Sequence, residues 1–259
     1  MSEYQYYEFR TVNRTLTREE VKEVDSWSSR GNVSSTSATF TYNFGDFKRD
    51  PKQCLLAHFD MMLYYANYGC RRMIFRFPKK LVSLKTLQHY DYSHAEDYQS
   101  SIMISAEGDY VVVDIEENLE EGFTEWLDCE NTLAAVTPLW NDILNGDYRS
   151  LYLIWSQFVQ AAIEFEMIEK DEIEYPPIPN GLKKLTAALE EFNNFWDVDS
   201  DMVIELAQKS PDSTAKAIDF KKAISYLSDS EKSDFLLRFA QNEAYVLQAF
   251  LKQLEKLND

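Results

Sequence analysis

The hydrophobic pattern of this chain changes at Asn118. Before that residue, short segments rich in aromatic and β-branched side chains alternate with helical segments, and turn residues separate them. After it, apolar side chains recur at helical spacing almost to the end of the chain. The sequence therefore predicts an α+β fold, in which an N-terminal mixed β-sheet with packed helices is followed by an all-helical C-terminal half.

Local signals place several elements of the first part. Thr17 and Glu20 form a capping box, so a helix is expected to begin directly after Thr17. The stretch 101–117 predicts a β-hairpin, because two strand-like runs flank a Glu-Gly-Asp turn. The stretch 54–68 is apolar on nearly every side, and it predicts a buried helix that Gly69 ends.

The same patterns divide the chain into four segments. We expect an α+β sheet domain over residues 1–118, and an acidic segment with central helices over 119–175. The proline-rich stretch 176–181 predicts a linker, and 182–259 predicts a C-terminal helical bundle. Within that bundle, a second capping box begins at Ser228.

The net charge of −18 is distributed unevenly along the chain. Residues 1–90 carry a net charge of +5, whereas residues 91–180 carry 21 acidic residues against only Arg149 and Lys170. Such a field repels nucleic acids and acidic membranes, and it attracts basic protein surfaces. The composition thus argues for a basic protein surface as the partner, and against nucleic acid or membrane.

The sequence shows no sign of export or of a cofactor site. No apolar run approaches the roughly 18–20 residues of a membrane helix, and the N-terminal residues lack the basic-then-apolar pattern of a signal peptide. The cysteines Cys54, Cys70 and Cys129 include no CxxC pair, so neither a disulfide framework nor a zinc site is expected. We expect a cytoplasmic protein without a cofactor.

Asp114 and Glu116 are the residues most suggestive of catalysis. They stand at i and i+2 of a predicted strand, so both carboxylates point to one side and can share a metal ion. Metal-dependent nucleases combine such a pair with further acids and a residue that activates water. Here the strand comes late in its layer, no HxxxD motif follows it, and the acidic surroundings repel a phosphodiester. A metal-dependent hydrolase is therefore the alternative, and a solvated strand end is the preferred interpretation.

Two histidine-containing patterns also carry side chains capable of chemistry. Cys54 and His58 lie four residues apart on the predicted buried helix, a spacing that can hold a metal, but two ligands do not make a site. The loop 89–94 combines His and Tyr side chains that could line a pocket. The sequence contains neither a nucleotide-binding glycine motif nor a nucleophile elbow.

Arg71, Arg72 and Arg76 lie on a predicted strand over 71–78, interleaved with aromatic residues. Basic side chains alternating with aromatic ones can bind single-stranded nucleic acid. The same alternation also describes a half-buried strand with a charged face, and the overall charge favours that interpretation. Weak binding of single-stranded nucleic acid is a second alternative.

The acidic segment 114–130 mixes carboxylates with aromatic and aliphatic side chains. An acidic run usually solubilises a surface, and this one can also neutralise the basic first third of the chain. Acids mixed with aromatic residues are, in addition, typical of a surface that binds a protein. We predict a non-catalytic adaptor whose partner-binding residues are Glu116, Glu117, Glu120, Glu121, Phe123, Trp126 and Asp128.

Several short motifs resemble an uncharacterised family of bacterial proteins. They are YYEF near the N-terminus, LT before the first helix, SSR at 28–30, GDFKRDP at 45–51, ANYGCRR at 66–72, GDYRSLYLIW at 146–155 and PPIPNGL at 176–182. The resemblance spans nearly the whole chain and implies a bacterial, cytoplasmic protein. It implies no activity, cofactor or catalytic residue.

Overall fold

The chain divides into two compact units, Met1–Asp212 and Ser213–Asp259. The computed structural model describes residues 3–93, 99–120, 122–123, 127–212 and 219–258. The first unit contains the sheet and every residue singled out above for a functional role, and the second contains the last helices of the chain.

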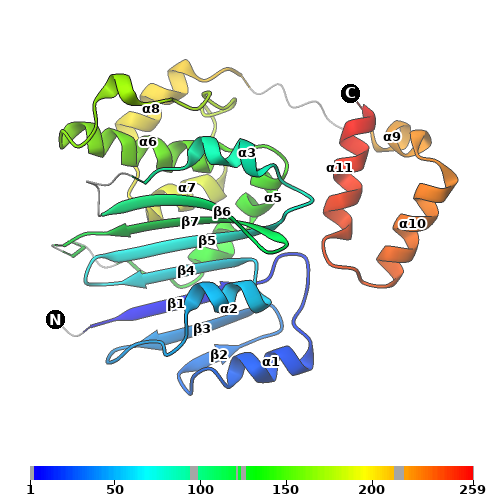
Figure 1. Ribbon diagram of the computed structural model, residues 1–259, viewed down its shortest axis with the longest axis horizontal. Helices are drawn as coiled ribbons and strands as arrows, with labels where there is room; N and C mark the ends of the chain where they lie inside the picture. The colour runs from blue at the N-terminus through cyan, green and yellow to red at the C-terminus, as the bar shows by residue number, and fades with distance from the viewer. Residues whose placement is uncertain (1–2, 94–98, 121, 124–126, 213–218, 259) are drawn as a thin grey trace. The chain divides into compact units, whose positions relative to one another are not determined.

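An antiparallel sheet forms the centre of the first unit (Figure 1). Its strands are β1 (Gln5–Arg10), β2 (Gly31–Val33), β3 (Ser37–Tyr42), β4 (Met61–Ala66), β5 (Cys70–Pro78), β6 (Ser100–Glu107) and β7 (Tyr110–Asn118). Their order across the sheet is β2-β3-β1-β4-β5-β7-β6. The predicted mixed sheet is wrong in this respect, since every pair of neighbours is antiparallel. The short β4–β5 and β6–β7 connections can join only antiparallel strands, whereas parallel strands need a long crossover.

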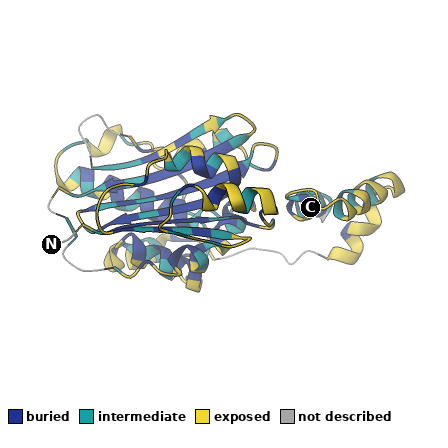
Figure 2. Cartoon of the chain, turned by 90° about the horizontal axis from the view of Figure 1, so that it is seen from below, coloured by how far each residue is buried: buried dark blue, intermediate teal, exposed yellow. Residues whose placement is uncertain are grey.

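Two helices, α1 (Arg18–Asp25) and α2 (Pro51–His58), cover one face of β1 and β3. α1 begins with the predicted capping box, in which the Thr17 hydroxyl accepts from the backbone N–H of Glu20. Beneath the two helices lies an aromatic core in which the rings of Phe9 and Phe59 are 5.4 Å apart. The strands are buried along much of their length (Figure 2), so the sheet is the interior of the first unit.

The helix predicted over 54–68 is wrong in its second half, because α2 ends at His58 and β4 follows. Met61, Met62 and Leu63 are consecutive in β4 and are all fully buried. Since neighbouring residues of a strand point to opposite faces, both faces of β4 must be covered. A strand covered on both faces is apolar on every side, as a buried helix is, so the hydrophobic period does not separate the two.

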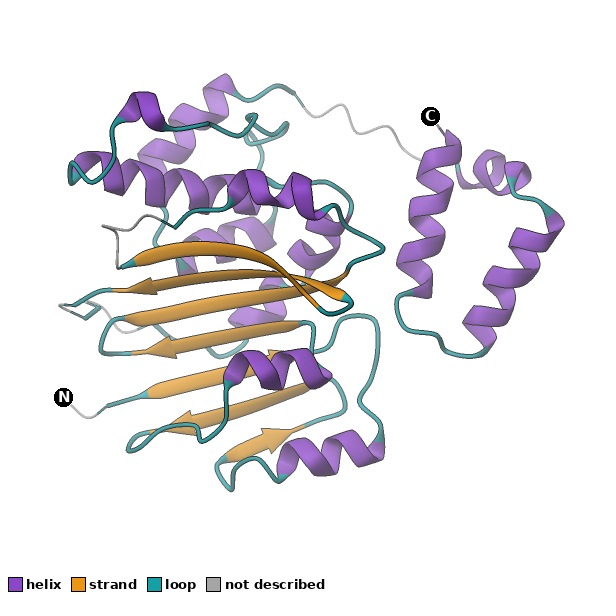
Figure 3. Cartoon of the chain, viewed as in Figure 1, coloured by secondary structure: helices purple, strands orange, loops and turns teal. Residues whose placement is uncertain are grey.

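After β7, the regular structure of the described residues is helical (Figure 3). In the first unit these helices are α4 (Thr132–Val136), α5 (Pro138–Leu144), α6 (Arg149–Glu164), α7 (Ala187–Phe195) and α8 (Ser200–Lys209), with a 3-10 turn η2 at Lys170–Glu172. Trp140 of α5 stacks on Phe77 of β5 with 5.3 Å between ring centroids, and its indole N–H donates to the Arg76 carbonyl at 2.9 Å. This contact packs the helical part on the sheet face opposite α1 and α2.

The proline-rich stretch 176–181, expected to be a linker, lies inside the first unit. Arg149, at the start of α6, donates from Nη1 to the carbonyl of Gly181 at 3.2 Å. The Ser210 hydroxyl at the end of α8 donates to the carbonyl of Pro179 at 2.8 Å. The stretch is therefore held to two helices by its own carbonyl groups.

The described part of the second unit contains α9 (Phe220–Tyr226), α10 (Asp229–Ala240) and α11 (Val246–Asn258). Its small core is formed by Ala223, Leu227 and Leu254. α10 begins with the predicted capping box, in which Ser228 and Glu231 bond to each other's backbone N–H groups. Residues 213–218 of the predicted helical bundle lie outside the described residues.

Candidate functional site

Asp114 and Glu116 lie on the same face of β7, and both face Arg72 of the neighbouring strand β5. Arg72 donates from Nε and Nη2 to the two oxygens of Asp114, at 2.7 Å each. Its Nε also lies 3.7 Å from Glu116 Oε2. Burial alone would lower the pKa of Arg72, but its hydrogen bonds and attraction to Asp114 raise it, so the guanidinium stays charged. A metal ion bound by Asp114 would have to displace this guanidinium.

Arg71 and Glu117 form a second ion pair on the opposite face of the sheet. The Nε of Arg71 donates to Glu117 Oε2 at 2.6 Å, and both side chains are buried. The Nη1 and Nη2 of Arg71 donate to the carbonyls of Phe195 at 2.8 Å and Trp196 at 2.9 Å, where α7 ends. Charge-assisted hydrogen bonds of this kind are strong, so Arg71 fastens α7 to the sheet.

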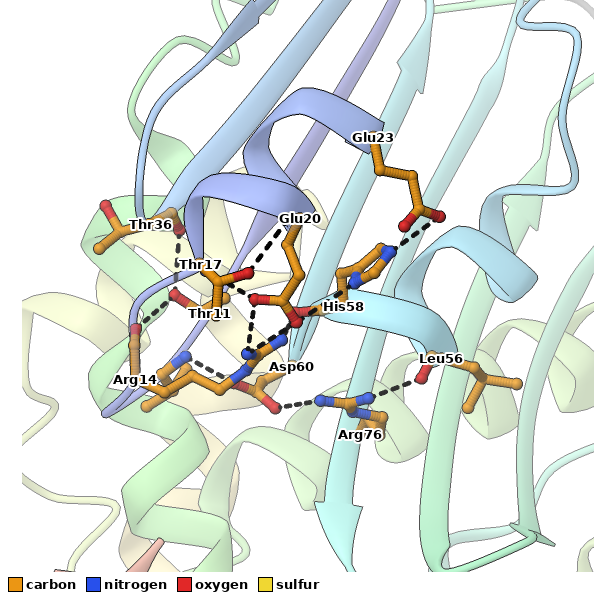
Figure 4. A network of polar contacts seen from close by, with 11 residues as sticks. Thr11, Arg14, Thr17, Glu20, Glu23, Thr36, Leu56, His58, Asp60 and Arg76 are labelled. Carbon is orange, nitrogen blue, oxygen red and sulfur yellow. Dashed lines mark hydrogen bonds and ion pairs between the residues drawn. The ribbon is translucent and has the colours of Figure 1, made fainter. Parts of the chain in front are cut away.

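Arg76 takes part in a buried polar network at the ends of β1, α2 and β5 (Figure 4). Its Nη2 donates to Asp60 Oδ1 at 2.8 Å, and its Nη1 donates to the carbonyl of Leu56 at 2.7 Å. The other oxygen of Asp60 accepts from the backbone N–H of Val12 at 2.7 Å. All three arginines considered for nucleic-acid binding thus contact carboxylates of their own chain, and a phosphate would have to compete with these contacts.

His58 lies between two glutamates of α1 in the same region (Figure 4). Its Nδ1 is 3.5 Å from Glu20 Oε1, and its Nε2 is 3.1 Å from Glu23 Oε1. These contacts are close, but they are not aligned as hydrogen bonds. Cys54 points into the aromatic core instead, where burial raises the pKa of its thiol to about 12. Within the described residues, no three His, Cys, Asp or Glu side chains are arranged to hold a metal ion.

The residues predicted to bind a partner do not share one surface. Glu120 and Asp128 are exposed, whereas Glu117 is buried on the face opposite Glu116. Phe123 packs inward, with its ring stacked 5.2 Å from that of Tyr65. Two further members of the predicted set, Glu121 and Trp126, lie outside the described residues.

A cavity of about 490 Å³ lies beside the loop 88–93, which supports the expectation that this loop lines a pocket. His89 and Tyr92 line it from the loop, and Trp155 lines it from α6. Its remaining wall is the segment 168–177. Tyr90 is buried and packs on Tyr148 with 5.7 Å between ring centroids, and His94 is outside the described residues.

The segment 164–175 was not predicted as a binding surface, and it is an exposed acidic stretch of the first unit. It carries six acidic residues and one lysine, all exposed. Phe165 is 71% exposed and Tyr175 is 49% exposed, so aromatic side chains stand among the acids. The alternation of acids with apolar residues directly after a long buried helix was the signal that could have identified it.

The carboxylates of this segment form no ion pair among the described residues, although Lys170 lies between two of them in the sequence. In the part of the chain that the structure describes, no Lys or Arg forms an ion pair with Glu164, Glu166, Glu169, Asp171, Glu172 or Glu174. This distinguishes the segment from Asp114 and Glu117, whose charges are balanced within the fold.

Comparison of the chain with protein-family models, curated proteins and solved structures gave no match. The resemblance to an uncharacterised bacterial family therefore stays a hypothesis. Among the described residues, none of the helices combines the length and the apolar character that crossing a membrane requires.

Proposed function

We propose that this protein is a non-catalytic interaction protein that presents an acidic, aromatic-containing surface to a basic protein partner. The observation that supports this function best is the segment 164–175, with its exposed carboxylates and the exposed rings of Phe165 and Tyr175. Carboxylates without cations repel one another, and a basic partner relieves that repulsion. The aromatic rings add apolar contact area, as they do in the core of protein interfaces.

The sequence-predicted residues contribute to this proposal in different ways. Glu120 and Asp128 are exposed, and they add negative charge to the same unit. Glu116 is half-buried beside Arg72, so it contributes less. Glu117 belongs to the buried pair with Arg71 and has a structural role in this proposal. The partner-binding role of Glu121 and Trp126 stays a prediction.

The two alternative functions have less support. A metal-dependent hydrolase would use Asp114, whose oxygens both bond to Arg72. Binding of nucleic acid would use arginines that are buried or paired with carboxylates. In each case the functional group would first have to leave an internal ion pair, and breaking a buried pair costs about 3–5 kcal/mol.

A cytoplasmic location forms part of the proposal. Cys54, Cys70 and Cys129 are free thiols. Free cysteines are usual in compartments where thiols are kept reduced. A bacterial origin rests on the sequence resemblance alone.

Isolation of the tagged chain from its source cells tests the proposal. We expect a stoichiometric basic protein that dissociates in about 0.5 M salt, where charges are screened within a few Å. The variant Glu166→Gln/Glu169→Gln should retain less of it, whereas Glu19→Gln/Asp25→Asn, with the same change in charge on exposed residues of α1, should behave like the wild type. A partner that is insensitive to salt, or lost equally in both variants, would contradict the proposal.

A further inference from the structure

We infer that the cavity beside the loop 88–93 receives an arginine side chain of the basic partner. This inference rests on the function proposed above. It identifies the cavity as one part of the surface that binds the partner.

The walls of the cavity are held in place by the sheet and by α6. The backbone of Tyr92 exchanges two hydrogen bonds with Ile102 of β6, at 2.8 and 2.7 Å. Its ring packs on Phe158 of α6, with 6.0 Å between centroids. On the other side, the ring of Tyr175 meets Trp155 edge-on at 5.5 Å. The cavity is therefore formed before any ligand arrives, which reduces the entropy that binding costs.

Acidic side chains contribute to the lining of the cavity. Asp91, Glu172 and Glu174 line it, and none of the lining residues that the structure describes is Lys or Arg. Asp91 is oriented by the sheet, since its Oδ1 accepts from the backbone N–H of Ile104 at 2.7 Å. In the described part of the chain, the carboxylates of Glu172 and Glu174 have no ion-pair partner.

A neighbouring cavity differs from this one in its charges, because it contains lysines as well as acids. That cavity, of about 430 Å³, shares Trp155 and Tyr175 with the first. It is also lined by Lys170, Lys209 and Glu205, and Lys209 pairs with Glu205 at 2.6 Å. The neighbouring cavity thus contains paired charges, whereas the acids of the first cavity have no ion pair among the described residues.

Aromatic walls together with carboxylates at the rim specify an organic cation. A cation over the face of Trp or Tyr is attracted by the ring, and the attraction increases as water is removed. A guanidinium is planar, so it stacks on rings and pairs with a carboxylate through two hydrogen bonds, whereas an ammonium does neither. The exposed ring of Tyr175, with Glu172 and Glu174, therefore fits arginine better than lysine. The largely buried rings of Trp155 and Tyr92 form the inner wall. The volume of about 490 Å³ holds that side chain with its adjoining peptide groups.

The direct test is an NMR titration of the full chain with acetyl-Gly-Arg-Gly-amide. We expect the indole N–H signal of Trp155, assigned with a Trp155→Phe variant, to shift in a saturable way. The same peptide with citrulline, which replaces the guanidinium by a neutral urea, should bind about 10-fold more weakly or not at all. The lysine peptide should bind about 3- to 30-fold more weakly. Equal responses to the arginine and citrulline peptides, or to arginine and lysine, would overturn the assignment.

Matched variants locate the site. Glu172→Gln/Glu174→Gln should weaken the arginine peptide about 10-fold or more, whereas Glu166→Gln/Glu169→Gln, with the same change in charge outside the cavity, should leave it within about 2-fold. Tyr175→Ala should weaken it about 3- to 30-fold. Phe165→Ala, which removes a more exposed ring of the same segment, should not.

The same variants separate this inference from the proposed function. The cavity variant Glu172→Gln/Glu174→Gln should lose both the arginine peptide and the partner isolated from cells. If this variant no longer binds the peptide but still binds the partner, the cavity does not contact the partner. The inference then fails, while the proposed function stands. If the wild type itself retains no salt-sensitive partner, the proposed function fails.

Discussion

Replacing Arg71 tests whether the arginines of β5 serve the fold. In Arg71→Met, the carboxylate of Glu117 loses its ion pair with the Arg71 guanidinium while it stays buried. Removing one member of a buried ion pair costs about 3–5 kcal/mol, because the remaining charge is left without compensation. The carbonyls of Phe195 and Trp196 also lose their donors. We expect the free energy of unfolding of the first unit to fall by about 3–5 kcal/mol.

The double variant Arg71→Met/Glu117→Met separates the ion pair from the contacts to α7. It leaves no buried charge, so the remaining cost is that of the two carbonyls, about 1–3 kcal/mol. The double variant should thus be more stable than the single variant, which is a coupling between the two sites.

The assay is urea unfolding of the wild type and both variants, followed by near-UV circular dichroism, which reports the tertiary packing of aromatic side chains. A loss below about 1 kcal/mol in Arg71→Met would refute the reasoning, because that is typical of an exposed residue. Such a small loss would make Arg71 a candidate for nucleic-acid binding again.

Three further predictions concern single groups. Gly69 has φ +111°, and a Cβ there would collide with the Leu119 carbonyl oxygen. Gly69→Ala should therefore lower the melting temperature, at a cost of about 1–3 kcal/mol, and an unchanged melting temperature would show that this turn is not tightly packed. Burial alone would raise the pKa of Glu20, but the hydrogen bond from the Thr17 N–H and the charge of Arg14 lower it below 4.5. The stability that Glu20 contributes is therefore complete above its unfolded pKa and is lost as the pH falls through its lower folded pKa, so Glu20→Gln should flatten the acid limb of stability measured by urea unfolding; an identical acid limb would contradict this. Burial raises the pKa of the Cys54 thiol to about 12, so Ellman's reagent should react with it far more slowly in the native chain than in urea, and equal rates would contradict its burial.

Local sequence signals predicted the elements they govern. The capping boxes at Thr17 and Ser228 begin helices where expected, because each needs only four neighbouring residues to form. The hairpin around Gly108 also forms as predicted, with Gly108 at φ +59°. The helix prediction over 54–68 was wrong in its second half, because β4 forms there and elements far away in the sequence cover both of its faces.

The candidate site was less predictable, because its interactions are long-range. The spacing of Asp114 and Glu116 correctly places them on one face, but nothing in the sequence shows that Arg72 occupies the space between them. Likewise, Arg71 meets the carbonyl of Trp196 across 125 positions of the chain. The sequence shows that acidic residues are concentrated in the middle third of the chain. Only the folded structure shows which of these carboxylates are exposed.

Site-specific photocrosslinking is the most direct test of the claim that the segment 164–175 contacts a partner. A photoreactive phenylalanine analogue at Phe165 replaces a ring that is 71% exposed, and Phe44, which is 73% exposed and lies far from this segment in the sequence, is the matched control. We predict a protein adduct from position 165 in source cells, reduced when the lysate is irradiated at high salt, and none from position 44. Adducts of equal yield from both positions, or none from position 165, would contradict the account.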